Sequence, residues 1–443
     1  MMKLKDLKDK KILILGFGRE GQDTFKFLKK LFPGNKIGIA DKIEASDFQQ
    51  KFPEVIKNKG TRFYLGSDHL KSAADHEVVI KTPGISLASL KPYLRRNTKV
   101  TSQTEIFLDN CPGKVIGVTG TKGKSTTSAL ICAILKAGEK KAQLIGNIGI
   151  PPLSYLAKAK KSDLFVFEMS CHQLAELKTS PYAAVLLNIY PEHLDYYKNF
   201  ACYAKAKANI TKWQNEKNYL VFDPDNGPAK KIANKSLAKK IEINPASVQK
   251  IMDEKNIPLK GDFNMINIAA AIEIGKIFKV PKAKIAKAVK NFKPLEHRLE
   301  KIGTYNGITF YDDALSTIEQ SAIAAIDALG ENVETILLGG FDRGLTFKKL
   351  AKKILESNIK TLILFPTTGQ KIFNEIEKQA QKGSFLPREF FVDNMADAVS
   401  LSYEHTTEGK ICLMSCASTS FSLFKDYREK GRLFKKYIEE FKK

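Results

Sequence analysis

Short apolar runs alternate with amphipathic segments along the whole chain. The runs that predict buried strands are Ile12–Leu15, Val78–Ile80, Val115–Val118, Leu164–Phe167, Val185–Leu187, Tyr219–Phe222, Ile336–Leu338, Leu362–Phe365 and Ile411–Met414. Helical segments lie between most of them. Because strands that are joined through helices form parallel βαβ units, this rhythm predicts an α/β fold with mostly parallel sheets and helices on both faces.

Two breaks in the pattern divide the chain. The first is Asn110-Cys111-Pro112-Gly113, just before a new strand, and the second is the segment 292–298, just after a helix. A length of 443 residues suits about three domains at roughly 150 residues each. We therefore predict domains at residues 1–111, 112–296 and 297–443.

Composition and charge narrow the class of protein. No apolar stretch approaches the roughly 18 residues of a membrane-spanning helix, and the start has no secretory h-region, so we expect a cytoplasmic protein. The six cysteines show no metal-binding or disulfide spacing. The formal charge is +24, but only nine of the 72 basic residues are arginine. Since arginine is the residue that reads phosphates and bases bidentately, we expect no nucleic-acid partner.

A glycine loop after the strand Val115–Val118 carries the strongest chemical signal. It reads Gly117-Val-Thr-Gly120-Thr121-Lys122-Gly123-Lys124-Ser125-Thr126-Thr127 and leads into a helix predicted over residues 125–136. Strand, glycines, Lys-Ser-Thr and helix occur in the order that a P-loop requires. In such a loop, backbone N–H groups hold phosphate oxygens, Lys124 reaches the β- and γ-phosphates, and Ser125 or Thr126 binds Mg²⁺. The sequence therefore predicts a nucleoside triphosphate site.

A second glycine loop, Gly16-Phe17-Gly18-Arg19-Glu20-Gly21, follows the first strand and opens a helix predicted over residues 22–30. Asp41 ends the next strand, as an acidic residue does in dinucleotide-binding folds. The spacing fits a dinucleotide, a nucleotide-sugar diphosphate or a tight turn without a ligand, and it does not choose among them.

Three polar residues follow the P-loop at suggestive positions. Glu168 ends an apolar strand at the edge where open α/β sheets bind ligands, so it is a candidate metal ligand beside ATP or simply a soluble strand end. His193 follows the next strand and is either a second metal ligand or an ordinary loop histidine. Lys207 lies among alanines on a helix predicted over residues 200–213 and either approaches the phosphates or is solvated.

Taken together, these motifs resemble the ATP-dependent Mur ligases, and among them the members that add D-glutamate. The resemblance covers nearly the whole chain. Besides the P-loop, it rests on Gly146-Asn147-Ile148-Gly149, Phe167-Glu168-Met-Ser-Cys-His-Gln173, Glu192-His193, Asn264-Met-Ile-Asn267, His297-Arg298-Leu-Glu300, Tyr311-Asp312-Asp313, Leu338-Gly-Gly-Phe-Asp-Arg343-Gly and Ser420-Phe421 through Tyr427.

The resemblance implies a fold and an activity. The fold has three domains: a Rossmann-like N-terminal domain, a central P-loop ATPase domain and a Rossmann-like C-terminal domain. The implied activity joins D-glutamate to UDP-N-acetylmuramoyl-L-alanine with ATP and two Mg²⁺ ions, through an acyl phosphate, in cytoplasmic peptidoglycan precursor synthesis. The enzyme is then expected to act as a monomer without membrane insertion.

The resemblance also assigns roles to residues. ATP is bound by Gly120, Thr121, Lys122, Gly123, Lys124, Ser125, Thr126, Asn264, Asn267, Arg298 and Asp313. Metal is held by Thr126, Glu168, His193 and Lys207 as a carbamate, with Lys205 as a competitor for that role. The UDP substrate contacts Gly16, Gly18, Arg19, Gly21, Asp41, Thr82, Pro83, Gly84 and Asn147. The amino acid contacts Thr317, Arg343, Ser420, Phe421 and Tyr427.

Some positions depart from the family pattern. Leu315 replaces a lysine and Ile318 an asparagine of the D-glutamate-adding members, while Phe263, Thr82 and Arg343 stand for histidine, serine and lysine. These departures leave open a Mur-type ligase for a different amino acid, a folylpolyglutamate-type ligase, or a nucleotide-binding regulator with weak catalysis. A dehydrogenase built on residues 16–21 leaves the P-loop unexplained.

Overall fold

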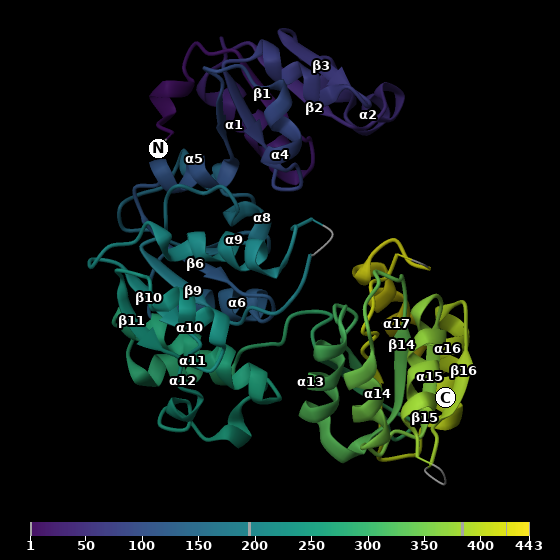
Figure 1. The fold of residues 1–443 in the computed structure, drawn as a ribbon. Coiled ribbons are helices and arrows are strands. Elements are labelled where there is room, and N and C mark those ends of the chain that lie inside the picture. The colour runs from purple at the N-terminus through teal and green to yellow at the C-terminus, as the bar shows by residue number, and fades with distance from the viewer. Residues whose placement is uncertain (1, 194–195, 382–384, 422, 443) are drawn as a thin grey trace. The chain divides into compact units, whose positions relative to one another are not determined.

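The structure is a computed structural model that describes residues 2–193, 196–381, 385–421 and 423–442 (Figure 1). Its contacts group the chain into two compact units. One comprises Met1–Asn256 with Ile266–Asn291, and the other comprises Ile257–Met265 with Phe292–Lys443. Three separate sheets carry the fold, two in the first unit and one in the second. The domain limits 1–111, 112–296 and 297–443 remain a prediction.

The N-terminal sheet is parallel throughout, with strand order β3-β2-β1-β4-β5. Its strands are β1 (Ile12–Leu15), β2 (Ile37–Asp41), β3 (Thr61–Leu65), β4 (Val78–Lys81) and β5 (Lys99–Thr101). Its helices are α1 (Arg19–Leu31), α2 (Ala45–Lys51), α3 (Pro53–Ile56), α4 (Leu87–Leu90) and α5 (Gln103–Asn110). Because all strands run the same way, their carboxyl ends place the Gly16–Gly21 loop, Asp41 and Thr82 at one edge.

The central sheet is also parallel, with order β11-β10-β9-β6-β8-β7. Its strands are β6 (Lys114–Thr119), β7 (Ala142–Gly146), β8 (Leu164–Glu168), β9 (Ala183–Leu186), β10 (Tyr219–Phe222) and β11 (Lys239–Glu242). Its helices are α6 (Lys124–Ala137), α7 (Leu153–Leu156), α8 (Cys171–Leu174), α9 (Phe200–Lys212), α10 (Gly227–Ala233), α11 (Asp262–Ile277) and α12 (Lys282–Lys290). The P-loop strand β6 lies between β8 and β9, so Glu168 ends beside the loop.

The C-terminal sheet is mixed, with order β12-β13-β17-β14-β15-β16. Only β12 pairs antiparallel, through the hairpin with β13. Its strands are β12 (Glu300–Tyr305), β13 (Ile308–Asp312), β14 (Val333–Gly339), β15 (Thr361–Phe365), β16 (Arg388–Phe391) and β17 (Ile411–Met414). Its helices are α13 (Glu319–Leu329), α14 (Lys348–Leu355), α15 (Thr368–Gln379), α16 (Met395–His405) and α17 (Tyr427–Phe441).

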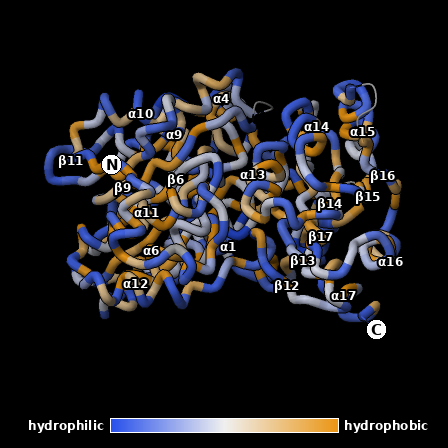
Figure 2. The backbone as a smooth tube through the Cα atoms, turned by 90° about the horizontal axis from the view of Figure 1, so that it is seen from below, coloured by the Kyte–Doolittle hydropathy of each residue, from blue (hydrophilic) through white to orange (hydrophobic). Residues whose placement is uncertain are grey.

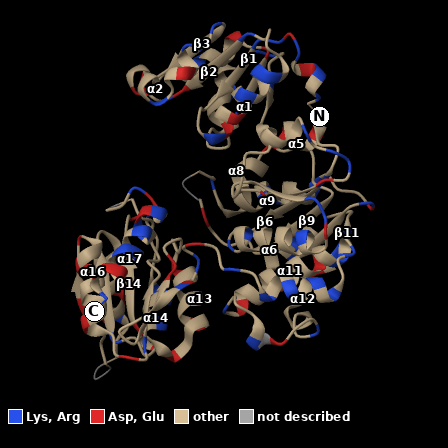
Figure 3. Cartoon of the chain, turned by 180° about the vertical axis from the view of Figure 1, so that it is seen from behind, with Lys and Arg blue, Asp and Glu red and all other residues tan. Residues whose placement is uncertain are grey.

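The buried core of the protein lies along the inner strands of the three sheets. Every residue of β1, β4, β8, β9, β14 and β15 is buried, and Figure 2 shows both hydrophobic and hydrophilic residues along the helices and loops around the strands. Basic and acidic residues are interspersed over those outer elements (Figure 3). None of the helices in the described part of the chain has the length and apolarity needed to cross a membrane.

The predicted α/β class is confirmed, and both predicted glycine loops join a strand to a helix. The helices begin earlier than the sequence predicts: α1 starts at Arg19 and α6 at Lys124. Gly21 therefore lies in the first turn of α1 rather than before it. A Cβ atom at Gly21 would lie 2.1 Å from the carbonyl oxygen of Gly16, so this close approach explains why a glycine stands inside a helix.

Candidate active site

The P-loop turns sharply at Gly123, which caps α6 with a left-handed φ of +86°. A Cβ atom there would lie 2.3 Å from Oδ1 of Asn267, and Asn267 Oδ1 also accepts a hydrogen bond of 3.1 Å from Thr127 Oγ1. Asn267, on α11, therefore lies against the start of the P-loop helix, while Ser125 and Thr126 are buried in its first turn. The structure thus brings together Gly123, Ser125, Thr126 and Asn267.

Two lysine side chains meet at one carbonyl of the loop. Lys124 Nζ donates to the carbonyl oxygens of Gly120 and Thr121 at 3.0 and 2.8 Å. Lys207 Nζ, from α9, donates to the same Gly120 oxygen at 2.8 Å. The Gly120 oxygen is therefore shared by two lysine amino groups, and the charge of Lys124 makes a second ammonium group unfavourable beside it.

Lys207 is almost fully buried, with a relative exposure of 1%. Burial, reinforced by the neighbouring charge of Lys124, lowers the pKa of Lys207 to about 7. Lys205 lies two residues earlier on α9 and is exposed. The structure therefore favours Lys207 over Lys205 as the lysine of this site.

Glu168 ends β8 beside the loop and is 1% exposed. Its Oε1 accepts a hydrogen bond of 3.1 Å from Asn147 Nδ2, whereas its Oε2 is buried without a hydrogen-bond partner. An unpartnered buried carboxylate oxygen is costly unless a cation or donor meets it. Together with the buried Thr126 hydroxyl, this oxygen fits a hard divalent cation such as Mg²⁺.

His193 follows β9 in a left-handed backbone conformation, with φ of +55°. Its ring lies 6.4 Å from that of Tyr203, and the Tyr203 hydroxyl is 3.0 Å from Thr121 Oγ1 in the P-loop. The neighbouring Glu192 forms an ion pair of 3.0 Å with Lys122. Although burial opposes it, the charges of Lys122 and Lys124 lower the pKa of Glu192 to about 2.

The N-terminal glycine loop packs tightly against the loop after β4. Gly16 has φ of +89°, and a Cβ atom on it would lie 2.1 Å from Thr82 Oγ1. Phe17 N–H donates to Asp41 Oδ2 at 2.6 Å, and Ile43 N–H donates to Asp41 Oδ1 at 3.1 Å. Asp41 thus holds the backbone of this edge together, and its contact with a ligand remains a prediction.

The glycine loop also reaches the central sheet. Arg19 Nη2 donates to the carbonyl oxygen of Gly149 at 2.6 Å, and Gln173 Nε2 donates to Glu20 Oε1 at 2.7 Å. Of the predicted UDP-site residues, Arg19 therefore contacts the loop that carries Asn147. The sequence-based assignment omitted Glu20 and Gln173, although Ser170-Cys-His-Gln173 is a capping-box pattern that the structure confirms.

Asn264, Arg298 and Asp313 belong to the second compact unit. Arg298 lies between two residues with left-handed backbone, His297 and Leu299, whose φ angles are +63° and +46°. His297 Nδ1 contacts Asp312 Oδ2 at 2.6 Å, and Leu299 N–H donates to Asp313 Oδ1 at 3.1 Å. Burial raises the pKa of Asp313 to about 7 despite Arg298 and the Ser415 hydrogen bond. These contacts fix Arg298 at the start of the C-terminal sheet.

The predicted amino-acid residues follow three neighbouring strands of the C-terminal sheet. Thr317 comes after β13, Arg343 after β14, and Ser420 and Phe421 after β17, which lies between those two strands. Arg343 is exposed, and Phe421 is 60% exposed. The Ser420 hydroxyl is buried without a hydrogen-bond partner. Tyr427 instead packs its ring 5.9 Å from that of His297.

These features define a P-loop nucleotide-binding protein of the α/β class, and comparison with known proteins places it further. The family described as Mur ligase middle domain matches residues 118–250. UDP-N-acetylmuramoylalanine–D-glutamate ligase of Lactiplantibacillus plantarum is 31% identical over 466 residues, covering 99% of this chain and 98% of that protein. The ligase of the same name from Caldicellulosiruptor saccharolyticus is 30% identical, covering 98% and 100%. The chain belongs to the Mur ligase family.

Solved structures share the fold. The UDP-N-acetylmuramate-alanine ligase MurC of Thermotoga maritima matches with a TM-score of 0.59 at 16% identity, covering 97% of this chain and 99% of that chain. The MurF ligase of the same organism, solved in complex with ADP, also has a TM-score of 0.59, at 17% identity, and covers 98% of this chain and 96% of that one.

Proposed function

We propose that the chain is an ATP-dependent ligase that adds D-glutamate to UDP-N-acetylmuramoyl-L-alanine in peptidoglycan precursor synthesis. The observation that carries this proposal is the match, over nearly the full length, to ligases of that name, combined with the meeting of Lys124 and Lys207 at the P-loop. The proposed enzyme is a cytoplasmic monomer.

The chemistry begins with a carboxylate that is a poor acyl donor. An oxygen of the alanyl carboxylate attacks the γ-phosphorus of ATP, and ADP leaves, which gives an acyl phosphate. The amine of D-glutamate then attacks the acyl carbon, loses a proton and expels phosphate, so an amide forms and no protein nucleophile is needed. Lys124 and the P-loop N–H groups stabilise the charge on the transferred phosphoryl group.

Thr126, Glu168, His193 and Lys207 are the residues that we propose to hold Mg²⁺. When bound, the metal neutralises charge on the phosphates and orients them for transfer. The unpartnered oxygen of Glu168 supports this proposal. The number of ions, two, is part of the proposal.

Lys207 supports the metal site as a carbamate in this proposal. The ammonium group first loses a proton. The neutral amine then attacks carbon dioxide, a nitrogen–carbon bond forms, one carbon–oxygen π bond opens onto its oxygen, and a second proton leaves the nitrogen, so that the product is an anionic carbamate. Burial and the lowered pKa of Lys207 favour the neutral amine that this reaction needs.

The remaining proposed site residues are assigned to the UDP substrate, to ATP and to D-glutamate. Gly16, Gly18, Arg19, Gly21, Asp41, Thr82, Pro83, Gly84 and Asn147 are proposed to bind the UDP substrate. Asn264, Asn267, Arg298 and Asp313 are proposed to complete the ATP site. Thr317, Arg343, Ser420, Phe421 and Tyr427 are proposed to bind D-glutamate, with the Arg343 guanidinium suited to pair with its side-chain carboxylate.

The proposal is tested by phosphate release from ATP with UDP-N-acetylmuramoyl-L-alanine and a panel of D- and L-amino acids. We expect release with D-glutamate, and we expect Lys124→Ala to abolish it. Release with another amino acid only would identify a Mur ligase of different specificity. Near-normal release by Lys124→Ala would show that the P-loop assignment is wrong.

A further inference from the structure

A short segment that follows β8 of the central sheet contacts residues near two loops of the N-terminal sheet. It runs from Glu168, the end of β8, through α8 to Glu176. Within it, Gln173 contacts Glu20 of the first glycine loop. Glu176, three residues further on, contacts the residues on either side of the loop that follows β4. One segment therefore touches one of the two loops to which we assign the UDP substrate and both flanks of the other.

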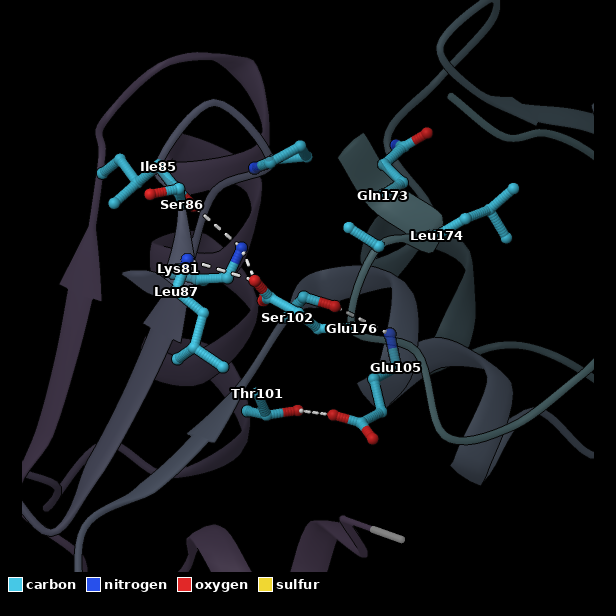
Figure 4. A network of polar contacts seen from close by, with 12 residues as sticks. Lys81, Ile85, Ser86, Leu87, Thr101, Ser102, Glu105, Gln173, Leu174 and Glu176 are labelled. Atoms are coloured by element: carbon cyan, nitrogen blue, oxygen red, sulfur yellow. Dashed lines mark hydrogen bonds and ion pairs between the residues drawn. The ribbon is translucent and has the colours of Figure 1, made fainter. Parts of the chain in front are cut away.

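Glu176 contacts the two residues that flank the loop after β4, Lys81 at the end of β4 and Leu87 at the start of α4 (Figure 4). Its Oε2 lies 2.9 Å from Lys81 Nζ, and its Oε1 accepts a hydrogen bond of 3.1 Å from the Leu87 N–H. Lys81 Nζ also donates to the carbonyl oxygen of Ile85 at 2.9 Å. The contacts thus hold both ends of the segment that contains Thr82, Pro83 and Gly84.

The ion pair is anchored in the protein interior. The Lys81 side chain is 4% exposed, whereas that of Glu176 is 32% exposed. A buried ammonium group needs a counter-charge, because desolvation is costly when no partner compensates it. For Lys81, the central domain supplies this charge through Glu176. A carboxylate that follows β8 of the central sheet therefore compensates the buried charge at the start of the loop after β4.

We propose that Glu176 is a positioning residue for the nucleotide-sugar substrate, which it serves by fixing residues 82–87 relative to the edge of the central sheet where Glu168 lies. This inference rests on the proposed function, because it takes Thr82, Pro83 and Gly84 as part of the UDP site. Glu176 acts through the loop and does not touch the reacting atoms.

The N-terminal domain offers a matched control. Glu77 also accepts from one lysine and one backbone N–H, with Lys10 Nζ at 2.8 Å and Lys11 N–H at 3.0 Å. Glu77 precedes β4, at the amino end of the strand, whereas Lys81 ends it. Glu77→Ala therefore removes the same kinds of contact away from the substrate loops.

The experiment compares Glu176→Ala, Glu77→Ala and the double variant Lys81→Met/Glu176→Ala in the full chain. Hydrogen exchange is measured for the peptide that covers residues 82–90, together with thermal stability and the KM values for UDP-N-acetylmuramoyl-L-alanine and ATP. We expect Glu176→Ala to accelerate exchange in this peptide and to raise the KM for the nucleotide sugar about tenfold, leaving the KM for ATP within about twofold. Glu77→Ala leaves both KM values unchanged.

The double variant separates positioning from simple charge neutralisation. Since it removes the unpaired ammonium group as well, we expect thermal stability to recover while the KM for the nucleotide sugar stays raised. Recovery of both would overturn the proposal, as would faster exchange with an unchanged KM. If the wild-type protein releases no phosphate with any amino acid, the proposed function fails. In that case, calorimetry on the same variants measures binding of the nucleotide sugar directly. Weaker binding by Glu176→Ala than by Glu77→Ala supports the role of Glu176, and equal binding contradicts it.

Discussion

Lys207 and Lys205 show how burial separates two lysines of one helix, of which the sequence resemblance already favours Lys207. Both lie on α9, but Lys205 is exposed and Lys207 is buried against the Gly120 carbonyl. Two residues along a helix correspond to a rotation of about 200°, which places the two side chains on nearly opposite faces. The environment of Lys207, and not its residue type, makes it a candidate for chemistry.

We predict that Lys207→Ala lowers the turnover at least a hundredfold, because the variant lacks the group from which the metal-supporting carboxylate forms. A small carboxylic acid such as acetate should partly restore turnover by filling the space. Lys205→Ala, the control, should remain within about twofold of wild type. Phosphate release measures all three. Full activity of Lys207→Ala without added acid would remove Lys207 from the mechanism.

Glu20 is a second residue whose behaviour depends on its surroundings. Burial, aided by the nearby Asp23 and opposed by the hydrogen bond from Gln173, raises the pKa of Glu20 from 4.5 to about 7. Between these values the folded protein retains a proton that the unfolded chain has released. The stability contributed by this group is therefore highest at low pH, falls as the pH rises from about 4.5 to about 7, and stays low above that.

We predict that Glu20→Gln flattens this part of the pH profile and stabilises the protein above pH 7 by about 1–3 kcal/mol. Denaturant unfolding of wild type and variant between pH 5 and pH 8 measures the difference. Glu54→Gln is the control, because the Glu54 side chain is 82% exposed. An equal pH dependence in wild type and Glu20→Gln would contradict the prediction.

At the scale of elements, the β1–α1 turn depends on close backbone packing. The first turn of α1 approaches the Gly16 carbonyl so closely that a side chain at Gly21 has no room. By contrast, a Cβ atom at Gly34, in the connection after α1, meets nothing within 4 Å.

We expect Gly21→Ala to destabilise the protein by about 2–3 kcal/mol, because the strand and helix must move apart. The same variant should weaken binding of the nucleotide sugar. Gly34→Ala should stay within about 0.5 kcal/mol of wild type. Urea unfolding and calorimetric titration give the two quantities. Unchanged stability of Gly21→Ala would show that the turn adjusts without cost.

The strands also show which elements a hydrophobicity pattern finds. The buried strands, such as β8 and β14, have every residue inside, and their apolar runs predict them correctly. The pattern misses the six edge strands of the three sheets, whose residues are mostly half-buried or exposed: β3, β5, β7, β11, β12 and β16. It also misses the inner strand β13, in which buried and half-buried residues alternate. An edge strand packs on fewer sides, so fewer of its positions need to be apolar.

At the scale of the whole molecule, most proposed UDP residues lie at the N-terminal sheet, the P-loop follows β6 of the central sheet, and Thr317, Arg343 and Ser420 follow strands of the C-terminal sheet. Asn147, Arg298 and Asp313 are exceptions to this division, whereas Arg343 is assigned to D-glutamate alone, so its substitution is expected to affect that substrate. Among the proposed D-glutamate residues, Arg343 is the one with a charged side chain. It follows β14 and is exposed.

Arg343→Ala should raise the KM for D-glutamate about 10- to 100-fold through loss of a charge-assisted hydrogen bond, with the KM for ATP unchanged. Lys349→Ala, which removes an exposed cation from α14, should change neither value. Steady-state kinetics with each substrate varied in turn measures both. A parallel rise in the two KM values would mean that Arg343 does not act on the amino acid alone.

By itself, the sequence determined the α/β class, both glycine loops and the order of the motifs, because these depend on local spacing and on runs of apolar residues. Only the tertiary structure decided that Lys207 rather than Lys205 faces the P-loop, that one oxygen of Glu168 is unpartnered, and that Glu176 holds the loop after β4. Such contacts join residues that are far apart in the chain. The loss of solvent around these residues in the folded protein then influences whether their side chains are charged. Local sequence contains neither the neighbours nor the burial that determine these properties.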